Sequence, residues 1–462
     1  MNTIAEKAQN LKIAYIGGGS RGWAWSLMKD LALAKGIAGR IALYDIDHEA
    51  AKHNEIIGNR ILVDHPEASR WEYEMAPTLE KALDGADFVV VSILPGTFNE
   101  MGSDIHTPEK YGIYQSVGDT IGPGGVIRTL RTVPMYEVIA EAIRDNCPNA
   151  WVINYTNPMT MCVRAMYRVF PQIKAFGCCH EVFSTQKILY EALDDIYGIK
   201  GLNRKDIKTN VMGVNHFTWV DKAQYGTMDL FPVYREYIDR VRAGEFKVNA
   251  VRQGLDLLFH SMEKVKFDLF DRFGIMAAAG DRHLAEFCPV NWYMKDPEHV
   301  KSWGYGLTTI DWRWNNLKTR MEKSAALVAG EKQELVQSRE EGVFQIRAIC
   351  GLEDLVSNVN IPNMGQIPNL PLGAVVETNA TFTSDDVRPV MAGPLPDSIY
   401  GLIAPVVGEQ EMVVEAALNR DLNLAFEAFC QDAHVQLPLN DARALFNEMV
   451  QNTKEYLPGY KI

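Results

Sequence analysis

The segment 12–20, KIAYIGGGS, is a short apolar strand pattern that runs directly into three glycines. A strand-to-helix turn of this kind needs backbone angles that other residues avoid, and a side chain there would hold a pyrophosphate away from the amides at the helix N-terminus. The segment therefore predicts a dinucleotide-binding turn made by Gly17, Gly18, Gly19 and Ser20, with an amphipathic helix starting at Ser20. Because the spacing is not a full G-x-G-x-x-G, an ordinary strand-to-helix turn is the alternative.

The next apolar run, 40–45, ends in Asp45. In dinucleotide-binding sheets an acid at the end of the second strand accepts hydrogen bonds from ribose hydroxyls, so Asp45 favours NAD over NADP. The alternative is that Asp45 only caps the following helix, although Asp47 is also placed to take that role.

The charge balance narrows the range of partners. The chain has 46 Lys and Arg against 59 Asp and Glu, a net charge of −13, which argues against non-specific nucleic-acid binding. An anionic substrate would need cations placed locally. No apolar run approaches the length of a membrane span, and seven cysteines without a secretion signal indicate free thiols in a reducing compartment. We therefore expect a cytoplasmic protein that contacts neither nucleic acid nor membrane.

Length and patterning predict two joined domains. Over residues 1–200, β-rich runs alternate with helical patterns, which predicts an α/β, Rossmann-type parallel sheet domain that binds the cofactor. Residues 201–462 mix strands with long helices and predict an α+β domain for substrate, metal and oligomerisation. The expected strands are 12–16, 40–45, 87–93, 150–154 and 173–178. The expected long helices are 250–270, 316–340 and 409–431, and the proline-rich segments expected as surface loops are 361–372 and 393–405.

Polar motifs cluster where the expected strands end, which is where ligands bind in open α/β sheets. Six motifs, in chain order, are Gly-Gly-Gly-Ser, Asp-Thr-Ile-Gly-Pro-Gly-Gly, Thr-Asn-Pro-Met, Cys-His-Glu-Val, Gly-Val-Asn-His-Phe and Gly-Asp-Arg-His. In this order they resemble the family 4 glycoside hydrolases, which use NAD and a metal instead of the usual pair of carboxylates. The resemblance implies the fold of the lactate and malate dehydrogenases.

One tetrapeptide indicates a subgroup. Cys-His-Glu-Val resembles the α-galacturonidase group, whereas Cys-His-Ser-Val is typical of α-galactosidases and Cys-His-Gly of α-glucosidases and α-glucuronidases. The resemblance implies hydrolysis of a small α-linked galacturonide by a homodimer or homotetramer, with α-galactosidase or α-glucuronidase activity as the nearer alternatives. A 2-hydroxyacid dehydrogenase of the same fold and a non-catalytic, NAD-binding redox sensor are alternatives from other classes.

The implied reaction explains why a hydrolase would carry a redox cofactor. The C2–H bond of a plain sugar is too weakly acidic to break, but oxidation at C3 by NAD makes a ketone that a divalent cation polarises. A base then removes the C2 proton, the aglycone leaves, water adds and NADH returns the hydride. NAD ends as it began, so the net reaction is hydrolysis.

The resemblance places a metal on Cys179 and His216, each at the start of a loop that follows a strand. Two protein ligands leave positions for substrate oxygens and water, as an octahedral Mn²⁺ prefers. The alternatives are a buried strand-end cysteine and a core histidine bonded to a backbone carbonyl. Cys178 is expected to pack in the core.

Asp281 matches the position of the C2 base in the family's α-glycosidases, with a salt bridge to Arg282 as its structural alternative. Asp119 and His180 are candidates to assist the leaving group, or to orient metal-bound water. These three residues are the catalytic candidates.

Three polar residues at strand ends are expected to face the ligands. Ser92 and Asn154 are expected on the nicotinamide side of the cofactor. Asn157 is expected to bond a sugar hydroxyl, with an ordinary Asn-Pro turn as the alternative.

A uronate carboxylate should meet an arginine, whose planar fork matches it. Arg128, Arg131 and Arg282 are the candidates near the motifs, and His283 is a further candidate for substrate binding. Glu181 would repel an anionic substrate, unless it accepts a hydrogen bond from the axial hydroxyl or holds an arginine in place.

Overall fold

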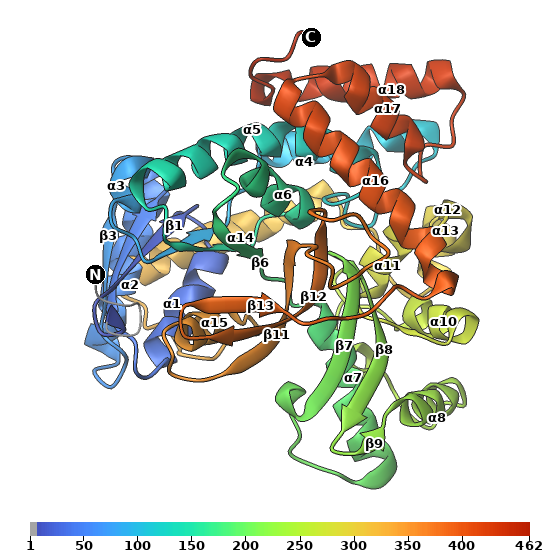
Figure 1. Cartoon of the computed structure of the whole chain (residues 1–462), viewed down its shortest axis with the longest axis horizontal. Helices are drawn as coiled ribbons and strands as arrows, with labels where there is room; N and C mark the ends of the chain where they lie inside the picture. Colours follow the sequence, from blue (N-terminus) through green and yellow to red (C-terminus); the bar gives the residue numbers. More distant parts are fainter. Residues whose placement is uncertain (1–6) are drawn as a thin grey trace.

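The computed structural model describes residues 7–462 and contains a nine-stranded sheet (Figure 1). Six strands are parallel in the order β3-β2-β1-β4-β5-β6, which is the arrangement of a doubly wound dinucleotide-binding sheet. The predicted α/β class is confirmed. These strands are β1 (Leu11–Ile16), β2 (Gly39–Tyr44), β3 (Trp71–Met75), β4 (Phe88–Val91), β5 (Trp151–Asn154) and β6 (Lys174–Gly177).

Three strands from the second half of the chain extend the same sheet. β11 (Leu355–Pro362) lies antiparallel beside β6, and β12 (Val375–Thr383) and β13 (Asp386–Pro389) continue outward. The sheet is therefore shared between residues 1–200 and residues 201–462, and the domain division near residue 200 stays a prediction.

Alternating side chains of the strands pack into two cores, one on each face of the sheet. On β4, Val89 and Val91 enter the first core, whereas Phe88 and Val90 enter the second. The helices of the first core are α3 (Leu79–Leu83), α5 (Gly122–Asn146), α6 (Met159–Val169), α16 (Asp397–Asn419), α17 (Leu422–Gln431) and α18 (Leu439–Asn452). The helices of the second core are α1 (Trp23–Leu33), α2 (His48–Asp64) and α15 (Gly342–Ile349).

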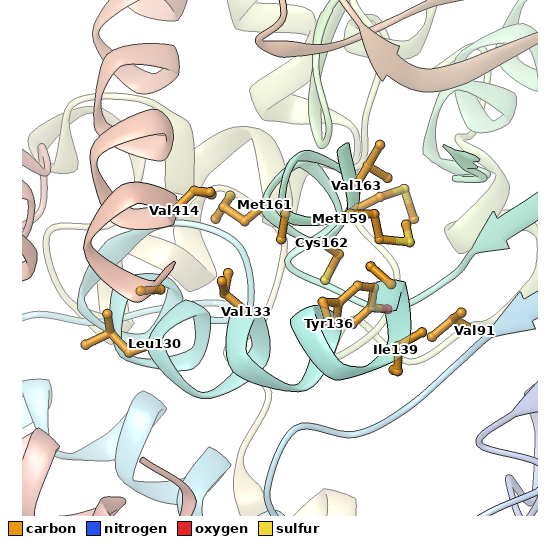
Figure 2. Packing of buried hydrophobic residues seen from close by; sticks show 14 of the residues in the cluster. Val91, Leu130, Val133, Tyr136, Ile139, Met159, Met161, Cys162, Val163 and Val414 are labelled. Carbon is orange, nitrogen blue, oxygen red and sulfur yellow. The ribbon is translucent and has the colours of Figure 1, made fainter. Parts of the chain in front are cut away.

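Helix α5 is central to the first core and leads out of the site loop. Figure 2 shows Val133 and Tyr136 of α5 beneath Met161 and Cys162 of α6, with Val414 of α16 beside them. These side chains all belong to the buried cluster, so α5 packs against both α6 and α16. The N-terminus of α5 is thereby fixed relative to the strand ends.

A second sheet, in the order β10-β8-β7, carries the other half of the site. β7 (Ile207–Val214) and β8 (Phe217–Tyr225) form an antiparallel hairpin, and β9 (Met228–Asp229) and β10 (Met276–Ala277) pair with β8. Its two faces pack into separate cores. The helices around it are α7 (Glu181–Tyr197), α8 (Phe231–Arg242), α10 (Lys264–Phe273), α11 (Asp281–Phe287), α12 (Val290–Tyr293) and α13 (Pro297–Ser302).

The predicted helix 250–270 was wrong. The chain forms α9 (Asn249–Gln253), leaves the helix at Gly254 with φ +62°, and starts α10 only at Lys264. A left-handed glycine at this position ends a helix, and the apolar periodicity on either side concealed the break.

The two other long helices differ from the prediction in extent. The predicted helix 316–340 is α14 (Ile310–Ala329), which ends at Gly330 with φ +116°. The predicted helix 409–431 is two helices, α16 and α17, because the Asp421 side chain accepts hydrogen bonds from the amides that begin α17.

The proline-rich segments are less exposed than predicted. Segment 361–372 is a connection between β11 and β12, but it buries Ile367 and Leu370. Much of 393–405 is helical. It belongs to α16, which begins directly after a proline and contains Pro405. Pro396 precedes the helix, where proline is tolerated, whereas Pro405 lies in the helix interior, so composition alone misplaced this boundary.

Among residues 7–462, no helix combines the length and the apolar character that crossing a membrane requires. The seven cysteines all lie within this range and are free thiols. All but one of them are buried.

Candidate active site

The glycine turn after β1 is closely packed. Gly17 has φ +91°, and a Cβ on it would lie 2.0 Å from the carbonyl oxygen of Ser92. The helix after the turn begins at Trp23, not at Ser20, and its N-terminus has no side-chain cap. Its first amides are therefore available to an anion.

The acid after β2 bonds this turn and does not cap the next helix. Asp45 Oδ2 accepts a hydrogen bond from the Gly19 amide at 2.8 Å. Asp47 is the residue that caps α2, since its side chain accepts from the Ala50 amide. The capping alternative for Asp45 is thus filled by Asp47.

The two residues expected near nicotinamide lie at neighbouring strand ends. Ser92 follows β4 and is 9% exposed. Asn154 ends β5, and its side chain accepts a hydrogen bond from the Tyr136 hydroxyl at 2.5 Å and donates one to the Thr156 carbonyl at 3.0 Å. Asn154 is therefore firmly oriented by protein groups.

His216 occupies a strained position in a two-residue hairpin loop. β7 and β8 pair from Val214 to Phe217, which leaves Asn215 and His216 as the turn. His216 has φ +65°, a left-handed conformation that is uncommon for a residue with a Cβ. Such a conformation costs backbone free energy, and it occurs here at a residue whose imidazole reaches Thr120.

Three potential metal-ligating side chains converge at this point. Asp119, His216 and His283 present ligand atoms that all lie within 4.8 Å of one another. The two imidazole rings stack with centroids 3.8 Å apart. The Thr120 hydroxyl donates to Asp119 Oδ1 at 2.8 Å and lies 3.0 Å from His216 Nδ1. Since its single proton is used by Asp119, Nδ1 of His216 is the donor to Thr120, which leaves Nε2 free as a ligand atom.

Burial and neighbouring charges shift the pKa values of His216 and Asp119. Burial, and then the neighbouring His283, lower the pKa of His216 to about 3, so that imidazole is neutral. Burial alone would raise the pKa of Asp119, but His216, Arg128 and His283 bring it below its usual range. The site therefore holds an ionised carboxylate beside a neutral imidazole, which are the protonation states that a metal requires.

Cys179 lies beside this cluster, outside the converging trio. Burial raises the pKa of its thiol well above the ordinary value, while the side chain of Asn215, next in the chain to His216, acts on it in the opposite direction. Beneath it the buried Glu377 accepts hydrogen bonds from Asn215 at 3.2 Å and Asn358 at 2.7 Å. Burial raises the pKa of Glu377 to about 7. Cys178 packs in the second core, as expected.

Glu181 is held by histidines and a backbone amide, and no arginine is paired with it in the described part of the chain. Its Oε2 accepts from the Gly280 amide at 2.8 Å. Burial would raise its pKa, but His283, His180 and His216 bring it to about 2. His180 in turn lies 2.9 Å from Glu340 through Nδ1, and this hydrogen bond raises its pKa against the effect of burial.

Helix α11 clamps the loop that carries Asp119. Glu286 Oε1 accepts from the amides of Val117 and Gly118 at 2.7 and 2.8 Å. Arg282 donates through Nη2 to the Ser116 carbonyl at 3.0 Å, and its own carbonyl accepts from the Ser116 hydroxyl. Arg282 is thus committed to protein groups, although it was a candidate for the substrate carboxylate.

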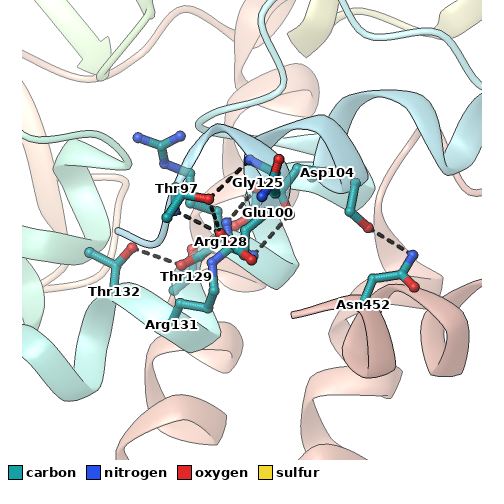
Figure 3. Close-up of polar contacts among 12 residues, drawn as sticks. Thr97, Glu100, Asp104, Gly125, Arg128, Thr129, Arg131, Thr132 and Asn452 are labelled. Carbon is teal, nitrogen blue, oxygen red and sulfur yellow. Dashed lines mark hydrogen bonds and ion pairs between the residues drawn. The ribbon is translucent and has the colours of Figure 1, made fainter. Parts of the chain in front are cut away.

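The arginines of α5 have different environments (Figure 3). Arg131 is fully buried and forms a bidentate ion pair with Asp104 of α4 (Phe98–His106) at 2.9 and 2.5 Å. Arg128 donates through Nε to the Asn157 carbonyl at 3.1 Å, while its buried Nη1 has no partner within the described residues. Asn157 donates through Nδ2 to Asp119 at 3.2 Å. Arg128 and Asn157 therefore border the cluster, and Arg131 does not.

Asp281 bonds the start of α10 and forms no salt bridge with Arg282. Its carboxylate accepts from the Lys266 amide at 3.1 Å and the Val265 amide at 3.3 Å. Burial, and then the charge of Glu263, raise its pKa to about 7.

Sequence reasoning missed three groups at the site. Glu286 lies three residues after His283, on the next turn of the same helix, and this spacing was a usable signal. Glu377 and Glu340 come from segments without a motif, and only the fold brings them to the strand ends.

Two family models match the chain. Residues 12–195 match the family 4 glycosyl hydrolases, and residues 211–435 match the family 4 glycosyl hydrolase C-terminal domain. The chain therefore belongs to the family 4 glycosyl hydrolases, and the resemblance drawn from the six motifs is confirmed.

Relatives of high identity cover nearly the full length. The chain is 57% identical to an α-galacturonidase from Thermoanaerobacterium saccharolyticum over 457 residues, covering 99% of this chain and 98% of the relative. It is 49% identical to an α-galacturonidase from Bacillus subtilis over 442 residues, covering 96% and 97%. The crystal structure of lplD from Bacillus subtilis superposes with a TM-score of 0.89 at 48% identity, covering 96% of this chain and all of that one.

A more distant structure shares the fold. A 6-phospho-α-glucosidase from gut microorganisms, solved with NAD and Mn²⁺, gives a TM-score of 0.80 at 19% identity, covering 98% of this chain and 100% of that one.

Proposed function

We propose that this family 4 enzyme hydrolyses α-linked galacturonides with NAD and Mn²⁺. The observation that carries the proposal is the identity of 49–57%, over almost the whole chain, to enzymes named α-galacturonidase. The Cys-His-Glu-Val motif and the arginines at the site agree with an acidic sugar.

The glycine turn fits NAD. Its tight packing leaves no room for a side chain, and the uncapped first turn of α1 offers amides to a pyrophosphate. Asp45 at the end of β2 favours a ribose with free hydroxyls over a 2′-phosphate, because a second anion there would be repelled. Ser92 and Asn154 would line the nicotinamide side.

The cluster fits a divalent cation. His216 presents a neutral imidazole with Nε2 free, Asp119 is ionised, and the buried Nδ1 of His283 has no partner within the described residues. We propose His216 and Cys179 as ligands, with Asp119 and His283 close enough to join them or to orient bound water. A mixed N, O and S set without a closed tetrahedron suits a catalytic metal.

The chain's own residues supply positioning and proton transfer. When bound, NAD would oxidise and re-reduce the sugar at C3, and Mn²⁺ would polarise the carbonyl. Asp281, with a pKa near 7, is the proposed acceptor of the C2 proton. His180 and Asp119 are the proposed donors to the leaving oxygen, with His180 oriented by Glu340. Asn157 would bond a hydroxyl of the sugar through its unpartnered Oδ1.

A panel of nitrophenyl α-glycosides tests the proposal. The galacturonide, glucuronide, galactoside and glucoside are each assayed with NAD, Mn²⁺ and a thiol reductant. We expect efficient cleavage of the galacturonide alone, and loss of turnover when NAD or metal is withheld. Equal cleavage of the galactoside would refute the assignment, and net formation of NADH from a hydroxy acid would favour a dehydrogenase.

We further propose a cytoplasmic homodimer or homotetramer. Free thiols suit a reducing compartment. The exposed apolar side chains of Met364, Leu372 and Met391 are candidates for a subunit contact. Light scattering after size-exclusion chromatography would measure the mass, and a monomer would refute the contact.

A further inference from the structure

Both other sequence candidates use terminal nitrogens to bind protein groups, although the Nε atom of each has no partner in residues 7–462. Arg131 is paired with Asp104, and Arg282 is bonded to the Ser116 carbonyl and the Thr308 hydroxyl. A carboxylate on the substrate therefore needs a cation that the structure has left without a partner.

Arg313, on the first turns of α14, is such a cation. Its buried Nε has no hydrogen-bond partner, and no carboxylate within residues 7–462 lies at ion-pair distance from it. Arg313 as a whole is only partly buried, but burying its Nε without a partner is costly unless a ligand or water compensates it. Burial lowers the pKa of Arg313 to about 10, so it still carries its charge at neutral pH.

The segment that leads into α14 lies against the site loop, since the Thr308 amide donates to the Ser116 carbonyl at 3.1 Å and the Thr308 hydroxyl accepts from Arg282. The charged groups that act on Arg313 are Asp119, Arg128, Arg282 and Glu286, all of which belong to the site or to the loop clamp. Counted with Arg313 itself, these are three guanidiniums and two carboxyls.

Beside Arg313 in the chain, one aromatic side chain packs against another that is partly exposed. The next residue back, Trp312, packs its ring against Phe259 with centroids 4.3 Å apart, and the Arg282 guanidinium lies 4.8 Å from the same Phe259 ring. Phe259 is 41% exposed.

We propose that Arg313 and the unpartnered Nη1 of Arg128 together bind the carboxylate of the sugar acid, which makes Arg313 the residue that selects galacturonides over galactosides. One guanidinium is on α5 and the other on α14, and each has a buried donor without a partner in the described residues. Arg128 also holds Asn157 and balances Asp119, whereas Arg313 has no other partner in residues 7–462. The specificity therefore depends mainly on Arg313. This inference rests on the proposed function.

The test compares two ligands that differ at one group, a charged carboxylate in the first and its neutral methyl ester in the second. Galacturonate and its methyl ester are bound, in the presence of NAD and Mn²⁺, to the wild type, Arg313→Gln, Arg313→Lys and the control Lys318→Gln, an exposed residue of the same helix. We expect Arg313→Gln to weaken galacturonate about 10- to 100-fold and the ester less than about twofold, with Arg313→Lys intermediate and the control unchanged.

Each other outcome overturns the inference. Equal weakening of both ligands would make Arg313 structural, and no weakening would exclude it from the site. A loss of NAD affinity in Arg313→Gln would assign the guanidinium to a cofactor phosphate. A wild type that fails to bind galacturonate or cleave galacturonides removes the proposed function as well, and the wild-type measurement alone identifies that case.

Discussion

The Arg131–Asp104 pair allows a quantitative test of which arginines are structural. Both side chains are almost completely buried, at 0% and 1% exposed, and Asp104 has no other side-chain hydrogen-bond donor in residues 7–462. Arg131→Met would leave an uncompensated carboxylate in the interior, which costs about 3–5 kcal/mol. Asp104→Leu would leave an uncompensated guanidinium with a similar cost.

The double variant should recover most of this loss, because two apolar side chains replace the pair without leaving a buried charge. With an unfolding entropy of about 2.1 cal/mol/K per residue, a chain of this length loses roughly 1 °C of Tm per kcal/mol. We therefore expect each single variant to melt roughly 3–5 °C lower, and the double variant to melt within about 2 °C of the wild type.

Differential scanning calorimetry measures these shifts, and galacturonide kinetics on the same samples provide the second readout. Folded single variants should keep the KM of the wild type. The reasoning is refuted if Arg131→Met melts like the wild type while its KM for the galacturonide rises tenfold, since Arg131 would then be a substrate contact.

Three further predictions concern the ligand groups. Cys179→Ser and His216→Ala should abolish metal-dependent hydrolysis while NAD fluorescence titrations stay unchanged; full turnover in either variant removes it from the metal site. Asp45→Ala should weaken NAD about tenfold and reduce the preference over NADP, measured as two dissociation constants, and an unchanged ratio contradicts the ribose assignment. Glu377 binds a proton more tightly when folded, with a pKa near 7 against an unfolded value near 4.5, so it lowers stability as pH rises through this window. Glu377→Gln should flatten that pH dependence by about 3 kcal/mol in urea titrations, and an identical slope in both proteins would contradict it.

Local sequence patterns were sufficient to predict most strands of the parallel sheet. Buried strands such as Phe88–Val91 are continuous apolar runs, and the glycines after β1 mark the turn unambiguously. β3 was missed because Trp71–Met75 alternates apolar and acidic residues on an edge strand, a pattern that a short loop also shows. Antiparallel additions such as β12 depend on contacts between distant segments, which periodicity does not encode.

The site was predictable to the extent that its residues lie in motifs. Asp119, His216 and His283 each lie in a motif and converge in the structure, although the sequence assigned them different roles and paired His216 with Cys179. The sequence did not distinguish an arginine that forms an ion pair from one that does not. The pairing depends on which carboxylate of another helix lies beside the arginine in the fold. Asp104 neutralises Arg131, while Arg313 comes from a helix with no recognisable signature.

The attachment of β11 to β6 has a consequence for dissecting the enzyme. A fragment that stopped near residue 200 would expose the hydrogen-bonding edge of β6 and remove the helices that cover the α5–α6 side of the sheet. Exposed strand edges with unpaired backbone groups pair with other chains, which leads to aggregation. We therefore expect that engineering of either half will need the intact polypeptide.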